Sequence, residues 1–214
     1  YSLIGIDPDL VVRGSGTQAE VNRNWATDRS AFVGVDGNPL DALRALVSEC
    51  RIDPLPEGLP PALACLVGYF AYESYALVEA LPRPAPNPID VPDMIFVRPR
   101  LILVFDRLAD ELWLVAPVWP GSALADRVVD DAAERIEAAA ARLAGPTPVP
   151  PARMVDGGEP ALAPTLPAGR YREMVLAAKE HIVAGDIFQV VLAQRFTAPF
   201  TLPPFDLYRA LRRI

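Results

Sequence analysis

The side chains that most often carry out acid-base or nucleophilic chemistry are sparse in this sequence. The single histidine, His181, falls on the polar side of an expected helix, where a solvated side chain is the simplest interpretation. Acid-base catalysis within these residues would have to use carboxylates, tyrosines or Lys179, and their spacing forms no recognisable pair. The sequence also lacks a zinc-type cluster, a nucleotide loop and a nucleophile elbow.

Three further features have a structural and a functional interpretation. Gly14 and Gly16 resemble a phosphate loop, but no helix, Lys or Ser/Thr follows in register, so a hairpin turn is favoured. Cys50 and Cys65 have neither the number nor the spacing of a metal site or disulfide framework, so we interpret both as buried thiols. Gln189 lies in an apolar run, and an unpaired buried amide costs about 1–3 kcal/mol. A backbone partner is favoured over a ligand.

The carboxy-terminal part of the sequence predicts a helix, a strand and a second helix. Apolar residues at helical spacing begin at Tyr171, and Gly185 is expected to end this helix in a left-handed conformation. Residues 187–196 are apolar on both alternating faces, which predicts a strand covered on both sides. After a proline-rich turn, the spacing from Phe205 predicts an amphipathic helix that continues to Ile214 without a cap.

The amino-terminal part predicts strands and three helices. Asn38 is a natural helix cap and Pro39 suits the first helical position. Gly68, inside an apolar strand, indicates a close backbone approach or a bulge. The helix after Pro39 is expected to bury one face, made of Leu40, Leu43, Leu46, Val47 and Cys50. The expected strands are residues 2–6, 10–13, 18–25, 31–35, 63–72, 100–108 and 111–118, and the other helices are residues 73–81 and 122–143.

Composition limits the class of protein. The chain has 214 residues, of which 51% are hydrophobic, enough for a packed core. A net charge of −7 and a pI near 4.8 disfavour nucleic acid as a partner. No apolar run approaches the roughly 20 residues that span a bilayer, and no leader opens the sequence, so we expect a soluble, cytoplasmic protein without a membrane partner. Tyr1 in place of a methionine, together with the uncapped end at Ile214, suggests a segment of a longer polypeptide.

The sequence predicts a boundary between two domains. Residues 146–167 contain seven prolines and no apolar period, which is typical of a linker. We therefore expect an amino-terminal domain over 1–145, a linker over 146–168, and the beginning of a second domain over 169–214. Strands at both ends of the chain, with helices on their outer faces, favour an α+β fold.

Two motifs resemble one known family. Residues 185–196, GDIFQVVLAQRF, followed by PFDLYRALR at 204–212, resemble the opening of the chorismate-binding domain of the anthranilate synthase component I family. Residues 66–73, LVGYFAYE, then Leu81-Pro82 and Pro92-Asp93-Met94, resemble the amino-terminal domain of the same family in the same order. The sequence departs from the family where a glycine pair is usual, at Ala64-Cys65, and where Asp is usual, at Glu73.

The resemblance implies a lyase of tryptophan biosynthesis. Such an enzyme converts chorismate and ammonia, supplied from glutamine by a glutamine amidotransferase subunit, to anthranilate and pyruvate, and tryptophan inhibits it by feedback. It implies Mg²⁺, an oligomeric assembly, and helices packed around two layered, largely antiparallel sheets. The catalytic and Mg²⁺-binding residues of the family follow the 187–196 segment in sequence, so we assign no catalytic, cofactor-binding or metal-binding residue here. Only Tyr1 matches a position beside the regulatory tryptophan pocket, and an ordinary strand residue is the simpler interpretation.

Two alternatives remain open from the sequence. Aminodeoxychorismate synthase component I is a close relative that usually has Asn where this chain has Val191, whereas Ala193 is compatible with both enzymes. A second alternative, of a different class, is a non-catalytic lobe that binds a regulatory amino acid and a glutaminase partner. Residues beyond Ile214 would distinguish the first alternative.

Overall fold

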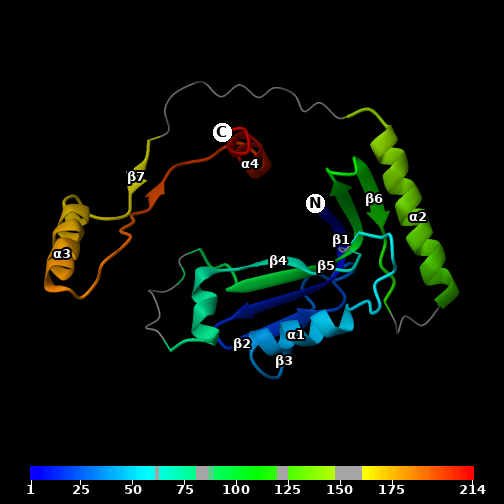
Figure 1. Cartoon of the computed structure of the whole chain (residues 1–214), viewed down its shortest axis with the longest axis horizontal. Helices are drawn as coiled ribbons and strands as arrows, with labels where there is room; N and C mark the ends of the chain where they lie inside the picture. The colour runs from blue at the N-terminus through cyan, green and yellow to red at the C-terminus, as the bar shows by residue number, and fades with distance from the viewer. Residues whose placement is uncertain (61–62, 81–86, 88, 120–124, 148–160) are drawn as a thin grey trace. The chain divides into compact units, whose positions relative to one another are not determined.

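The computed structural model describes residues 1–60, 63–80, 87, 89–119, 125–147 and 161–214. The chain divides into two compact units, Tyr1–Pro148 and Val149–Ile214 (Figure 1). The predicted linker lies mostly outside the described residues, so the predicted domain limits stay a prediction. Each unit is described below by itself.

The first unit is built on a six-stranded antiparallel sheet. Its order is β3-β2-β1-β5-β4, and β6 pairs with β5 near the carboxy end of β5. Strands β1 and β5 pair along nearly their whole length, from Ser2 opposite Phe105 to Gly14 opposite Met94. This long pair is the central ladder of the sheet (Figure 1). The strands are β1 (Ser2–Ser15), β2 (Gln18–Asn22), β3 (Val33–Val35), β4 (Val67–Phe70), β5 (Met94–Asp106) and β6 (Glu111–Val115).

Strand β1 joins two strands that the sequence predicts separately. Residues 2–6 and 10–13 belong to one strand, and the register shifts between Pro8 and Leu10. Asp7 adopts a left-handed conformation with φ 54°, and Pro8 lacks the N–H that a regular ladder needs. The Arg100 side chain donates hydrogen bonds to the Asp7 carbonyl and carboxylate across the pair. The irregularity is therefore accommodated as a bulge, and the strand continues.

The hairpin from β1 to β2 is confirmed, but β2 ends at Asn22, earlier than the predicted residue 25. The buried Asn22 side chain accepts a hydrogen bond from the Asn24 N–H and donates one to the Asp28 carbonyl, at 2.8 Å each. These bonds replace ladder bonds and turn the chain away from the sheet.

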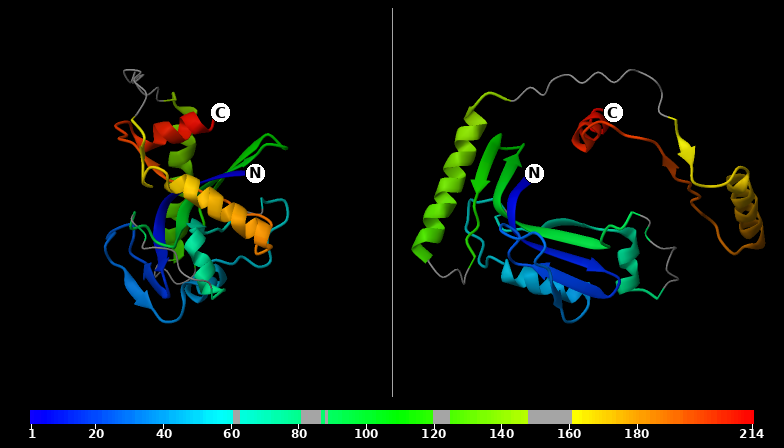
Figure 2. Two further views of the ribbon diagram at one scale, coloured as in Figure 1. Left: turned by 90° about the vertical axis from the view of Figure 1, so that its left-hand side faces the viewer. Right: turned by 180° about the vertical axis from the view of Figure 1, so that it is seen from behind.

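Helix α1 (Pro39–Glu49) begins where the sequence predicts. The Asn38 side chain accepts hydrogen bonds from the Leu40 and Asp41 N–H groups, which caps the helix. α1 packs against β1 and β2 (Figures 1 and 2). The prediction for its buried face is partly wrong, because Val47 is 53% exposed and Ala42 is buried instead. The resulting core cluster contains Leu10, Val12, Val21, Leu46 and Met94.

The remaining elements of the first unit differ from the predictions mainly in length. The 63–72 strand is reduced to β4, and the predicted helix over 73–81 is the 3-10 helix η1 (Tyr72–Leu77), while Leu81 and Pro82 lie outside the described residues. The strand predicted from residue 100 begins at Met94. Helix α2 (Ala125–Ala144) lies beside β5 and β6 (Figure 2).

The second unit confirms the two predicted helices but not the strand between them. It contains α3 (Arg170–Ala184), α4 (Pro204–Leu211), β7 (Ala163–Pro164) and β8 (Phe196–Thr197). Gly185 ends α3 with φ 79°, as expected. α4 ends at Leu211 and does not reach Ile214.

The predicted 187–196 strand is wrong for this chain. Phe188 is 94% exposed and Val191 is 83% exposed, and ladder pairing begins only at Phe196, opposite Pro164 in β7. An extended segment becomes a covered strand only when neighbouring strands and a packed face are present. The described residues of the second unit supply neither around 187–195. The α+β class and the antiparallel sheets are confirmed.

Candidate functional site

The Pro92-Asp93-Met94 motif lies where the β1–β2 hairpin, β4 and η1 meet. The Asp93 carboxylate accepts a hydrogen bond of 2.7 Å from the Gly16 N–H in the hairpin turn. The Asp93 carbonyl accepts bonds from the Ala71 N–H at 2.7 Å and from the Ser74 hydroxyl at 2.8 Å. The glycine turn that resembles a phosphate loop is therefore closed by an internal carboxylate. The hairpin interpretation is confirmed, and Asp93 has a structural role.

We expect Asp93→Ala to lower the free energy of unfolding by about 1.5–3 kcal/mol, because the Gly16 N–H loses a charged acceptor. Asp93→Asn keeps an oxygen that accepts the same bond and is expected to lose less. Urea unfolding followed by circular dichroism measures both values. Equal losses for the two variants would contradict this role for the carboxylate.

A second group of polar side chains is centred on Arg98. Arg98 is 8% exposed and donates from Nε and Nη2 to the two carboxylate oxygens of Asp9, at 2.8 Å each. Its Nη1 donates to Glu49 at 3.1 Å, and Arg23 donates from both terminal nitrogens to the same carboxylate at 2.9 and 2.8 Å. The Arg98 guanidinium carbon also lies 5.0 Å from the centre of the Trp119 ring. We call Asp9, Arg23, Glu49 and Arg98 the Arg98 network.

The network shifts the pKa values of its members. The hydrogen bond from Arg23 lowers the pKa of Glu49, and burial opposes this effect less strongly. Burial works against the charged form of Arg98, but the hydrogen bonds and the charge of Asp9 outweigh it and raise its pKa. Both arginines are therefore charged throughout the physiological range, and the network acts as a set of fixed charges.

The lowered pKa of Glu49 makes the pair with Arg23 dependent on pH. A carboxyl whose pKa is lower in the folded state contributes stability above its ordinary pKa, and this contribution is lost as the pH falls through the lowered value. We expect Arg23→Gln to be less stable than the wild type above about pH 5, with the difference shrinking toward pH 3. Urea unfolding at a series of pH values measures this. A difference that grows on acidification would contradict the assignment.

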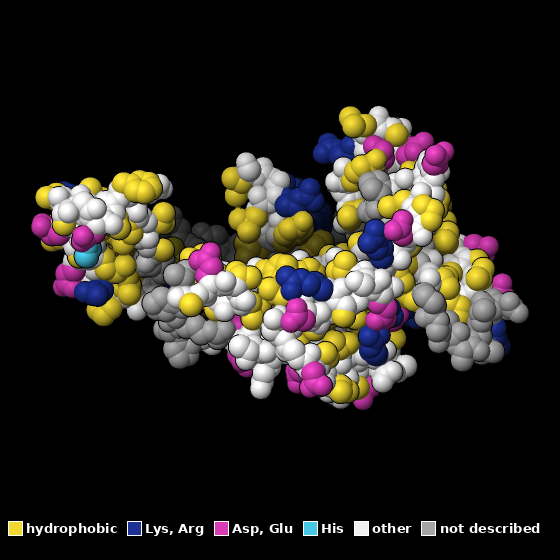
Figure 3. Space-filling view, turned by 60° about the horizontal axis from the view of Figure 1, so that its bottom comes forward, with side chains coloured by type: hydrophobic (Ala, Val, Ile, Leu, Met, Phe, Trp, Pro, Cys, Tyr) yellow, Lys and Arg dark blue, Asp and Glu magenta, His cyan; other side chains and the backbone are white. Residues whose placement is uncertain are grey.

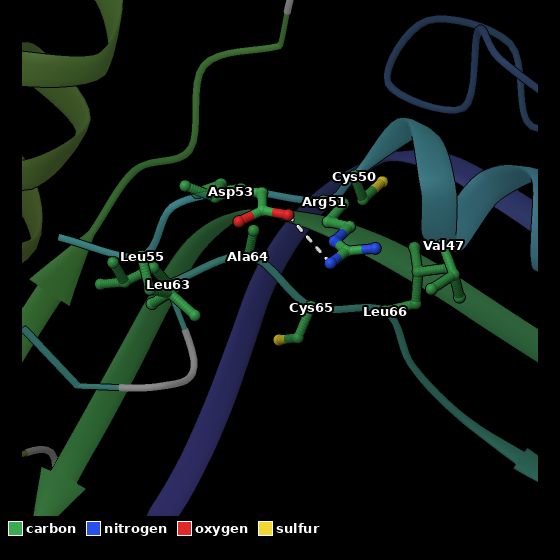
Figure 4. A pocket seen from close by; sticks show the side chains of 10 residues that line it. Val47, Cys50, Arg51, Asp53, Leu55, Leu63, Ala64, Cys65 and Leu66 are labelled. Carbon is green, nitrogen blue, oxygen red and sulfur yellow. Dashed lines mark ion pairs between the residues drawn. The ribbon is translucent and has the colours of Figure 1, made fainter.

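The two cysteines line one cavity of about 370 Å³ in the first unit (Figure 4). Cys50 is buried and Cys65 is half-buried, so the prediction of buried thiols holds fully for Cys50 only. Burial raises the pKa of both thiols, which keeps them protonated and weakly nucleophilic. Arg51 and Asp53 beside them form an ion pair of 2.9 Å. The described residues contain no group of three or more potential metal ligands.

The other residues singled out by sequence do not converge. Tyr1 precedes β1 and is 68% exposed, and its place beside a tryptophan pocket stays a prediction. His181 is exposed, as expected, and its Nδ1 lies 2.8 Å from the Asp186 carboxylate. Gln189 and Lys179 are exposed, so the expectation of a buried, paired amide at Gln189 is wrong here.

Sequence reasoning missed Arg98, although a signal for it was present. Its β5 neighbours are almost all apolar, and a charged residue in such a run indicates a buried partner. The predicted strand began at residue 100 and so excluded it. Surface charges of both signs are otherwise interspersed with exposed hydrophobic side chains (Figure 3).

Comparison with known proteins gives the class to which this fold and these motifs belong. The chorismate binding enzyme family model matches residues 9–214, and the chain belongs to this family. Anthranilate synthase component 1 of Cereibacter sphaeroides is 42% identical over 218 residues, which cover 100% of this chain and 43% of that protein. The protein of the same name from Thermus thermophilus is 39% identical over 81% of this chain and 36% of its own length.

A solved structure confirms the fold. Anthranilate synthase component I from Streptococcus pneumoniae TIGR4 matches with a TM-score of 0.74 and 23% sequence identity, covering 99% of this chain and 44% of that one. The chain thus spans less than half the length of these relatives. Among the described residues, no helix is both long enough and apolar enough to cross a membrane.

Proposed function

We propose that the protein containing this chain is component I of an anthranilate synthase. It would convert chorismate and ammonia to anthranilate, pyruvate and water, with the ammonia released from glutamine by a glutamine amidotransferase subunit. The observation that carries this proposal is the 42% identity with a protein named anthranilate synthase component 1 over the whole of this chain. The Pro92-Asp93-Met94 and GDIFQVVLAQRF motifs, which resemble those of this family, support it.

The chemistry is assigned to the part of the protein that this chain does not include. The described residues hold no group of three or more carboxylate, histidine or cysteine side chains placed for a metal ion, so no Mg²⁺-binding residue is assigned among them. We therefore route no catalytic step through them. In this proposal the first unit is a supporting domain, and the catalytic domain begins at residue 169, with the 187–196 segment in its opening part.

The proposal is tested with the full-length protein, chorismate, ammonium ion and Mg²⁺. Anthranilate fluorescence and an equal amount of pyruvate are expected, and removal of divalent cations with a chelator is expected to abolish both. Glutamine is expected to replace ammonium only when the amidotransferase subunit is added. No anthranilate under any of these conditions would overturn the proposal. An aminated product without pyruvate would indicate aminodeoxychorismate synthase component I instead.

We further propose feedback inhibition by tryptophan, an oligomeric assembly and a cytoplasmic location. Support for inhibition comes only from the match of Tyr1 to the edge of the regulatory pocket. Tyr1→Ala in the full-length enzyme is expected to raise the tryptophan concentration needed for half-inhibition while leaving the uninhibited rate unchanged. An unchanged inhibition curve would remove Tyr1 from the pocket.

A further inference from the structure

Arg135, on helix α2, is a charged side chain without a partner. It forms no ion pair or hydrogen bond within the described part of the chain, and its Nε is buried and unpaired. Uncompensated charge next to a protein interior is costly, and buried donors are nearly always paired. The Arg135 side chain is half-buried, and its terminal guanidinium nitrogens, unlike the enclosed Nε, are accessible to a ligand.

Arg135 faces a cavity of about 350 Å³ that has an excess of positive charge. Four arginines and two carboxylates line it: Arg23, Arg98, Arg100, Arg135, Asp9 and Glu49. Both carboxylates are already engaged, since Asp9 accepts from Arg98, and Glu49 accepts from Arg23 and Arg98. Arg100 is paired with Asp7. Neither carboxylate pairs with Arg135, and the lining has two more arginines than carboxylates.

A second unpaired donor lies in the same cavity. Trp119 lines it, and the Trp119 indole Nε1 is buried without a hydrogen-bond partner. Both unpaired groups are donors, so the missing partner is an acceptor. The two enclosed nitrogens are not themselves open to a ligand, but the excess of arginines and the unpaired Arg135 guanidinium favour an anion in this cavity.

Arg135 also lines a second cavity, of about 540 Å³, between α2 and the sheet. Three of the residues that line it are charged, namely Asp7, Arg135 and Arg142. The other six are apolar and come from β1, β5 and α2: Ile6, Leu101, Leu103, Ala138, Ala139 and Leu143. Arg135 lines both cavities, so its guanidinium lies between an arginine-rich cavity and one whose walls are mostly apolar. A ligand that uses both cavities has an acid group and an apolar body.

We propose that Arg135 is the anion-binding residue of a site for a small organic carboxylate. The acid group pairs with the Arg135 guanidinium and takes up its unpaired donor capacity, and the apolar part occupies the cavity beneath α2. Carboxylate geometry suits a guanidinium, and the apolar cavity offers nothing to an inorganic anion. This site does not depend on the proposed catalytic function, because none of its residues lies in the second unit.

Calorimetric titration of the full-length protein with benzoate tests the site. Benzamide has the same ring without the charge, and acetate has the charge without the ring. Saturable benzoate binding is expected, with both comparators at least about tenfold weaker, because each lacks one half of the match. Arg135→Gln is expected to weaken benzoate binding about 10- to 100-fold, the range for losing a charged hydrogen bond.

A matched control is available on the same helix. Arg127 is exposed and lines neither cavity, so Arg127→Gln removes the same charge and is expected to leave benzoate affinity unchanged. Arg135→Gln removes no hydrogen bond or ion pair of the folded chain, so its thermal unfolding midpoint without benzoate is expected to equal or exceed that of the wild type. Non-saturable binding, unchanged affinity in Arg135→Gln, equal weakening in Arg127→Gln, or equal binding of either comparator would overturn the proposal.

Discussion

Gly68→Ala is expected to be among the most destabilising single-methyl substitutions in the first unit. Gly68 in β4 is opposite Phe96 in β5. A Cβ at this position would lie 1.9 Å from the Ile95 carbonyl oxygen and 2.7 Å from the Phe96 Cα. These are backbone atoms of the central strand, so no side-chain rotation relieves the overlap, and β4 has to move away from β5.

The expected loss is about 3 kcal/mol, at the upper end of the cost of overpacking. The matched control is Gly34→Ala in β3, where no atom lies within 4 Å of the added Cβ. Gly34→Ala is expected to change stability by less than about 1 kcal/mol. Urea unfolding of the two variants measures the difference. Similar midpoints for both would show that β4 adapts without cost.

The sequence predicted either a close backbone approach or a bulge at Gly68, because a glycine interrupts an apolar strand, and the structure shows the close approach. The cap at Asn38 and the stop at Gly185 were predictable because each depends on residues within one turn. The hydrogen bond between the Asp93 carboxylate and the β1–β2 hairpin turn was not predictable. Gly16 is 77 residues away from Asp93, and only the folded sheet brings them together.

The 187–196 segment shows what a local pattern cannot predict. Its apolar residues on both faces are typical of a strand covered on both sides. Whether neighbouring strands are present depends on other parts of the chain. In this chain Phe188 and Val191 remain exposed. Periodicity therefore predicted that the segment needs a neighbouring strand and cover on both faces. The described residues of the second unit do not supply them around 187–195.

The candidate carboxylate site was also beyond sequence reasoning. Arg135 belongs to a helix whose polar side looks uniformly solvated, and its lack of a partner is a property of the assembled unit. The sequence predicted a helix over 122–143 and nothing about its packing. Which of its arginines faces a cavity depends on how the helix packs against β5 and β6.

Replacing Arg98 is expected to cause the second large loss of stability, because the Asp9 carboxylate is left partly buried without its partner. Arg98→Leu removes both hydrogen bonds to Asp9, whose side chain is 25% exposed. Breaking a buried ion pair from one side costs about 3–5 kcal/mol, and the partial exposure of Asp9 favours the lower end, about 3 kcal/mol. Arg98→Lys keeps the charge but loses the two parallel bonds, so an intermediate loss is expected.

Two comparisons separate this effect from a general loss of surface charge. Arg23 makes an equally short pair with Glu49, but its side chain is 58% exposed, and Arg23→Gln is expected to cost at most about 1 kcal/mol at neutral pH. The double variant Arg98→Leu with Asp9→Leu removes both charges and is expected to recover most of the loss, because no buried charge remains unpaired. Urea unfolding of the wild type, Arg98→Leu, Asp9→Leu and the double variant gives the coupling free energy between Arg98 and Asp9 directly. A double variant that is no more stable than Arg98→Leu would mean that the packing of the arginine, and not its charge, stabilises the sheet.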